Sequence, residues 1–140
     1  MANRNFNGAF HYDSSTIVEK AGANIEDVRN RIFKYDENGD VVLAAAGDIP
    51  VGIALIEAGY NDITGVESGK AAKGDDVDIL IKGIGFVLAG AEIKKGQEIA
   101  AGADGKAAVA TSGNPVLGIA LSNAAADGYC KIMIARYQKA

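Results

Sequence analysis

The sequence contains one segment twice, and this repeat constrains the fold more than any other feature. Gly39–Leu55 reads GDVVLAAAGDIPVGIAL and Gly105–Leu121 reads GKAAVATSGNPVLGIAL, a gapless match at an offset of 66, the difference between 39 and 105. The residues kept in both copies are small or apolar: Gly39, Ala44, Gly47, Gly52, Ile53, Ala54 and Leu55 recur as Gly105, Ala110, Gly113, Gly118, Ile119, Ala120 and Leu121. Such a match indicates one supersecondary unit used twice, and two copies are too few for a solenoid.

The pattern between and around the copies is typical of short β-strands. Apolar residues alternate with polar ones at Val77, Ile79 and Ile81, which is the period of a half-buried strand. Tight-turn dipeptides stand at equivalent places in the two copies, Asn38-Gly39 and Asp104-Gly105. We therefore predict a mainly β fold, a compact barrel-like or sandwich-like domain over residues 21–140, with repeat copies near 32–55 and 98–121.

Helices are expected to contribute little to this domain. The alanine-rich segments are good helix formers, but glycine interrupts each within a few residues. We predict at most one or two short helices, with residues 24–30 and 122–126 as the candidate segments. The alternating apolar face changes phase at Gly83, which predicts a bulge or a hairpin turn there.

Composition supports one compact domain with a thin aliphatic core. The chain has 140 residues, 18 glycines, only 2 prolines and no tryptophan. A chain of this size can bury roughly two thirds of its unfolded surface, so it needs no metal or disulfide for stability. Many glycines with few prolines indicate many tight turns. Cys130 stands alone, which excludes an intramolecular disulfide and predicts a buried small apolar side chain.

Residues 1–20 differ from the rest and are predicted to form an extended N-terminal arm. Asparagines and aromatics alternate there without a core pattern, and a terminus of this kind needs something to hold it in place. Either the domain's own surface or a partner holds it, and the candidate partner-binding residues are Asn3, Arg4, Asn5, Phe6, Asn7, Phe10, His11 and Tyr12. The aromatics would anchor the arm, because aromatic side chains dominate interface energetics.

Charge and hydropathy narrow the class of partner. The net charge is −4 and the basic residues are scattered, so we expect no nucleic-acid partner. The first ten residues lack the apolar segment of a signal peptide, and no stretch approaches the roughly 18 apolar residues of a membrane span, so we expect no membrane partner.

The motifs that suggest chemistry are incomplete, and we predict that the protein is not an enzyme and binds no metal or cofactor. The lone histidine, His11, has no catalytic framework around it. Asp36, Asn38 and Asp40 resemble part of a calcium loop, but Gly39 comes too early in that motif. Lys94 and Lys95 invite comparison with biotin or lipoyl carrier domains, whose hairpin signature they lack.

The second copy and its surroundings carry a family pattern. Five short motifs follow one another in order. They are a glycine before apolar residues, a G-x-x-I-x-x-G connection, an Asp-Gly turn, a GIAL stretch before Ala-Ala and a last apolar strand. They stand at Gly83–Phe86, Gly90–Ile99, Asp104-Gly105, Leu117–Gly128 and Ile132–Ile134. Over about residues 25–136 the chain resembles the small head decoration (capsid cement) proteins of tailed bacteriophages. The N-terminal arm, the GIAL unit in the first half and the long loop at 58–74 depart from that pattern.

The resemblance implies a virion structural protein, made in the host cytoplasm, that binds the major capsid protein on the capsid exterior and stabilises the expanded lattice. It also implies a homo-oligomer, with a trimer favoured. An alternative is a carbohydrate- or receptor-binding β module on the phage head, such as a head-fibre base, although the absence of tryptophan counts against sugar binding. A further alternative is an enzyme or carrier domain.

Overall fold

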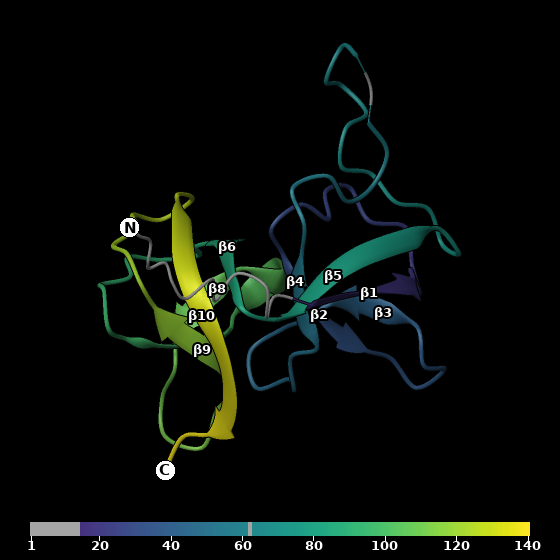
Figure 1. The fold of residues 1–140 in the computed structure, drawn as a ribbon. Helices are drawn as coiled ribbons and strands as arrows, with labels where there is room; N and C mark the ends of the chain where they lie inside the picture. Colours follow the sequence, from purple (N-terminus) through teal and green to yellow (C-terminus); the bar gives the residue numbers. More distant parts are fainter. Residues whose placement is uncertain (1–14, 62) are drawn as a thin grey trace, which may run out of the picture.

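The fold consists of two five-stranded antiparallel sheets, which lie side by side in Figure 1. The computed structural model describes residues 15–61 and 63–140. The first sheet has the order β1-β5-β4-β2-β3, with the strands Ser15–Lys20, Asp76–Lys82, Gly52–Ala54, Ile32–Tyr35 and Val41–Leu43. The second has the order β6-β10-β9-β7-β8, with the strands Ile84–Leu88, Tyr129–Gln138, Pro115–Ala120, Glu98–Ala101 and Ala107–Val109.

The internal repeat predicted from the sequence is confirmed by the strand order and the register. Adding five to each strand number converts the order of the first sheet into that of the second. Paired residues correspond as well, since Ile32 lies opposite Ile53 in the first sheet and Glu98 lies opposite Ile119 in the second. We call residues 15–82 the first half and residues 84–138 the second half.

The mainly β class is also confirmed, but neither sheet closes into a barrel in the described part of the chain. Each sheet curls until its outer strands meet at one residue, through the parallel bridges Ala21 to Val41 and Ala89 to Ala107. The two bridges are equivalent positions of the repeat. Each half is therefore an open, curled sheet with an apolar inner face.

The predicted limit of at most one or two short helices is confirmed, because residues 24–30 and 122–126 are not helical and the one 3-10 turn in the described residues is Ala103–Gly105. The sequence expectation for Gly83 was wrong. Gly83 forms neither a bulge nor a hairpin, because β5 and β6 belong to different sheets. Its positive φ of 103° turns the chain from the first sheet into the second. Alternation along a strand reports which face is buried, but not which sheet the strand joins.

The core is aliphatic, as composition predicted, and the halves share it. In the described residues, Phe33 is the one aromatic side chain that is fully buried. One cluster lies within the first half, whereas the cluster of the second half also contains Ile32, Ala44 and Ile53 from the first half. The first half therefore packs its sheet onto the core of the second half.

The Asp104-Gly105 turn joins the halves at close range. Gly105 donates its backbone N–H to the carbonyl of Ala44 at 2.8 Å. Its φ is +70°, and a Cβ there would stand 2.7 Å from the carbonyl oxygen of Ile32. A side chain at this position would be strained and would also clash, so glycine is required for the contact between the halves.

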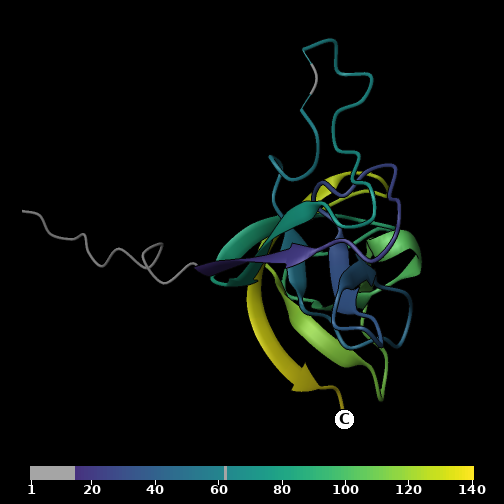
Figure 2. The same cartoon turned by 90° about the vertical axis from the view of Figure 1, so that its right-hand side faces the viewer.

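A long loop between β4 and β5 distinguishes the first half. Figures 1 and 2 both show it projecting away from the two sheets. The offset between equivalent residues is 66 before the loop, from Ile53 to Ile119, and 53 after it, from Leu80 to Met133. The loop is therefore 13 residues longer than its counterpart in the second half, the difference between the two offsets.

Candidate functional site

The predicted arm residues, Asn3 to Tyr12, lie outside the described residues. The described chain begins at Ser15, and residues 15–20, which sequence analysis placed at the end of the arm, form β1. β1 pairs with β5 on one side, and apart from the Ala21 bridge its other side carries no strand of the described chain. The first strand of the described chain is thus an edge strand.

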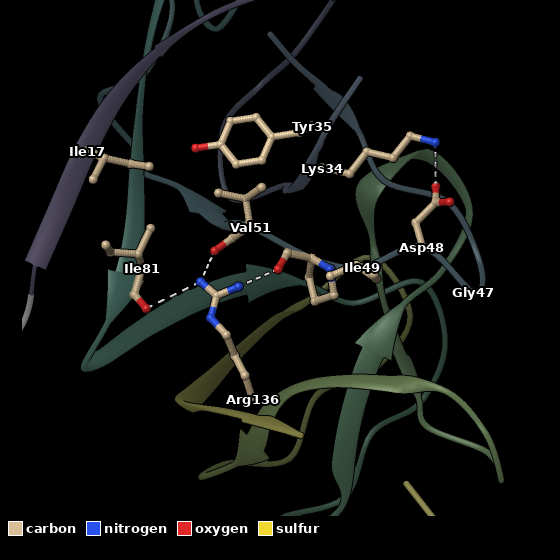
Figure 3. Close-up of a pocket in the computed structure, with 10 residues that line it drawn as sticks. Ile17, Lys34, Tyr35, Gly47, Asp48, Ile49, Val51, Ile81 and Arg136 are labelled. Atoms are coloured by element: carbon tan, nitrogen blue, oxygen red, sulfur yellow. Dashed lines mark hydrogen bonds and ion pairs between the residues drawn. The ribbon is translucent and has the colours of Figure 1, made fainter. Parts of the chain in front are cut away.

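Beside this edge strand lies a groove of about 860 Å³. We call it the open groove. Figure 3 shows Ile17 of β1 and Ile81 of β5 on one side, Tyr35 above, and Ile49 on the other side. Its lining is completed by Lys34, Gly47, Asp48, Pro50, Val51 and Arg136. Ile49 is 77% exposed at the rim, which is unusual for a large aliphatic side chain.

Arg136 of β10 forms the floor of the open groove and ties it to the second half. Its guanidinium donates to the carbonyl oxygens of Pro50 and Val51, and more weakly to that of Ile81 at 3.4 Å. Partial burial lowers the pKa of Arg136, because the charged guanidinium loses contact with water. The side chain therefore acts as a strut that fixes the shape of the groove.

The other polar side chains of the groove already have partners. The ammonium of Lys34 lies 3.0 Å from the carboxylate of Asp48, and the pKa of Asp48 is lowered by this hydrogen bond and by the Ala45 amide. The Tyr35 hydroxyl donates to the Glu19 carboxylate, which raises the pKa of Tyr35. The groove thus offers shape and apolar area, and its polar groups hold its walls in place.

A second apolar surface lies on the outer face of β6, β9 and β10. Ile119 lies opposite Met133, and Met133 lies opposite Ile84, so the three side chains share one face. Met133 is 43% exposed and Ile84 is 49% exposed. We call Glu98, Ile119, Met133 and Ile84 the second row. Glu98 ends the row, where Tyr137 and Lys139 bind its carboxylate.

The loop between β4 and β5 presents a third apolar surface. Tyr60, Ile63 and Val66 are all exposed. Two backbone hydrogen bonds close the base of the loop, from Tyr60 N–H to Lys70 and from Gly69 N–H to Tyr60. The tip is therefore held away from the body on a narrow stalk.

The acidic motif at residues 36–40 has a structural role. Asp36 accepts from the backbone amides of Asn38 and Asp40, which completes the turn between β2 and β3. Among residues 15–61 and 63–140, no group of three or more potential ligands could hold a metal ion. Cys130 is buried, as predicted, and burial raises the pKa of its thiol.

Sequence analysis identified none of these three surfaces. The open groove combines residues from β1, β2, β5 and β10, which are far apart in the chain. One signal was available in the repeat, because Glu98 occupies the position equivalent to the buried Ile32. A charged residue at that position indicates that this face of the second half is not buried as it is in the first half.

Comparison with known proteins places these surfaces in context. A family model described as structural cement protein (E217 gp24/Pam3 gp6) matches residues 4–135. The chain belongs to this family of phage structural cement proteins. No curated protein sequence matches the chain.

One solved structure has a similar fold. The chain is similar to the crystal structure of the head fiber gp8.5 N base of bacteriophage phi29, with a TM-score of 0.62 and 21% identity. The match covers 91% of this cement-family chain and 98% of the other. In the described part of the chain, no helix is long and apolar enough to cross a membrane.

Proposed function

We propose that this protein binds the exterior of an expanded phage capsid and stabilises the lattice by linking neighbouring capsid subunits. The observation that carries the proposal is the family match over residues 4–135. In this role the protein is not an enzyme, its partner is the major capsid protein, and its location is the outer surface of the virion. The paired polar groups of the open groove suit a binding surface better than a catalytic one.

The N-terminal arm is proposed to make the capsid contact. An extended segment that continues from an edge strand can add a strand to a partner's sheet, which gains main-chain hydrogen bonds without a deep pocket. Phe6, Phe10 and Tyr12 would anchor it in apolar depressions. The polar arm residues would supply hydrogen bonds to the shell: Asn3, Arg4, Asn5, Asn7 and His11.

Self-association completes the proposed function. A homo-oligomer, with a trimer favoured, presents several arms to the shell at once. Linked binding events gain avidity, so modest single contacts suffice for stable attachment. Three arms that reach different capsid subunits would also hold those subunits together.

The test is co-sedimentation of the protein with expanded capsids of its own phage. Deletion of residues 2–13 should abolish sedimentation with the capsids while the melting temperature of the isolated domain stays unchanged. Replacement of the exposed loop residues Tyr60 and Val66 by serine is the matched control, and it should leave binding intact. Undiminished binding by the arm deletion would refute the arm model.

A second candidate function is a base that presents a partner outward from the phage head, such as a receptor-binding module. The projecting loop with its exposed Tyr60, Ile63 and Val66 is the observation that favours it. On that reading the loop, and not the arm, would be needed for the interaction. Loss of cell or glycan binding by phage that carry the loop variant would support it.

A further inference from the structure

The contact between the two halves shows what the inner face of such a sheet accepts. Ile32, Ile53 and Leu80 lie opposite one another on β2, β4 and β5, and we call them the first row. Ile32 and Ile53 belong to the core cluster of the second half. Leu80 occupies the space into which a side chain at Gly85 would project. The first row therefore fills the inner face of the second half.

The surface that receives the first row has an equivalent in the first half. The offsets of the repeat are 68 for β1, 66 for β2 to β4 and 53 for β5. In the second half this surface includes Ala101, Leu117 and Ile134, which belong to or pack against the cluster that contains Ile32 and Ile53, and Gly85, beside which Leu80 lies. The equivalent residues of the first half are Ile17, Tyr35, Val51 and Ile81, which all line the open groove. One of the two equivalent receiving surfaces is filled by the first row, and the other is filled by no part of residues 15–61 and 63–140.

The inserted row also has an equivalent. The residues of the first row correspond to Glu98, Ile119 and Met133 of the second row, which the same cross-strand pairs align. Leu80 is 4% exposed, whereas Met133 is 43% exposed. Each chain thus has one unfilled receiving surface on its first half and one exposed row on its second half.

We propose that the second row of one copy of this chain packs into the open groove of the next copy, head to tail. The contact repeats between copies the chemistry that already joins the halves within a chain: aliphatic side chains of a sheet face inserted into a curled apolar sheet. This inference rests on the self-association proposed above and is independent of capsid binding. A head-to-tail contact gives a closed ring when its rotation closes, as in a trimer.

Two differences make this contact weaker than the internal one. Glu98 replaces Ile32, so one end of the second row is polar. Tyr35 and Ile17 are larger than their equivalents Ala101 and Gly85, so the open groove is shallower. The contact is therefore expected between separate folded copies and does not contribute to the core of each one.

The experiment measures the mass of the full-length protein by native mass spectrometry and sedimentation velocity, without capsids. Ile49→Asp places a charge in the groove, and Met133→Glu places one in the row. Each should raise the dissociation constant by about 30-fold or more, because the contact would bury an unpaired charge among aliphatic side chains. Ile63→Asp, on the exposed loop tip, is the matched control and should associate like the unmodified protein.

Mixing the two variants tests the direction of the contact. Met133→Glu retains an intact groove and Ile49→Asp retains an intact row, so an equimolar mixture should form a heterodimer although each variant alone is a monomer. This rescue also shows that both variants are folded. Unmodified protein that stays monomeric, single variants that associate normally, or a mixture that stays monomeric would each overturn the proposal. Since capsids are absent, these outcomes are separate from failure of capsid binding.

Discussion

The first and second halves share strand order, register and turn chemistry, yet equivalent faces have opposite surroundings. The row on the first half is buried against the second half, whereas the row on the second half is exposed. The receiving surface of the second half is filled, whereas that of the first half remains the open groove. Because the two halves pack head to tail, the row of the first half and the receiving surface of the second half are buried against each other. The equivalent row and receiving surface remain exposed, and binding partners can attach there.

The largest expected effect comes from removing equivalent side chains of the two rows. Ile53→Ala should cost about 2–5 kcal/mol of unfolding free energy, because Ile53 is 2% exposed and truncation leaves a cavity between the halves. Ile119→Ala removes a half-buried side chain and should cost about 1 kcal/mol. Urea denaturation at a concentration where the protein is monomeric measures both. Equal costs would contradict the assignment of one row to the interior.

The next effect compares equivalent glycines of the two turns. Gly39 and Gly105 both have positive φ, so alanine at either costs about 1–2 kcal/mol in backbone strain. Gly105→Ala should cost about 1–3 kcal/mol more, since its methyl group would press on Ile32. Around Gly39 nothing in the described chain lies within 4 Å of that methyl group. Thermal unfolding of both variants provides the measurement, and a smaller loss for Gly105→Ala would rule out the close contact between the halves.

The smallest expected effect on stability concerns two equivalent turn residues, Asp48 and Asn114. Their side-chain oxygens accept hydrogen bonds from the backbone amides of Ala45 and Thr111. The hydrogen bond from Lys34 lowers the pKa of Asp48 in the folded protein. Its stabilisation is therefore present above the ordinary aspartate pKa of about 3.9 and is lost as the pH falls through the folded value.

Between about pH 5 and pH 3, the Asp48→Asn variant should consequently lose less unfolding free energy than the unmodified protein. The difference should be under about 1 kcal/mol, because the Lys34–Asp48 pair is partly exposed to solvent. Urea midpoints across that range provide the measurement. Asn114→Asp is the control. Position 100 of the second half, which is equivalent to Lys34, is an alanine, so an aspartate at position 114 would have no lysine partner. If the stability of Asp48→Asn depends on pH as strongly as that of the unmodified protein, the ion pair between Lys34 and Asp48 does not contribute to acid sensitivity.

Local signals in the sequence predicted much of the fold and little of the site. The turns at Gly39 and Gly105 and the strands around them follow from nearby residues, which is why the repeat and the mainly β class were predicted correctly. The partition into two sheets depends on which strands meet across the molecule. At Gly83 the local pattern could not distinguish a turn within one sheet from a passage between two. The open groove arises from that partition, so it was not predictable from periodicity.

The central claim is that this cement-family protein stabilises a capsid, and the most direct measurement is the temperature at which expanded capsids of its phage break open. Capsids saturated with the full-length protein should withstand a higher temperature than undecorated capsids. Saturation with the protein lacking residues 2–13 should leave the temperature at the undecorated value. The same disruption temperature with and without bound full-length protein would contradict the account.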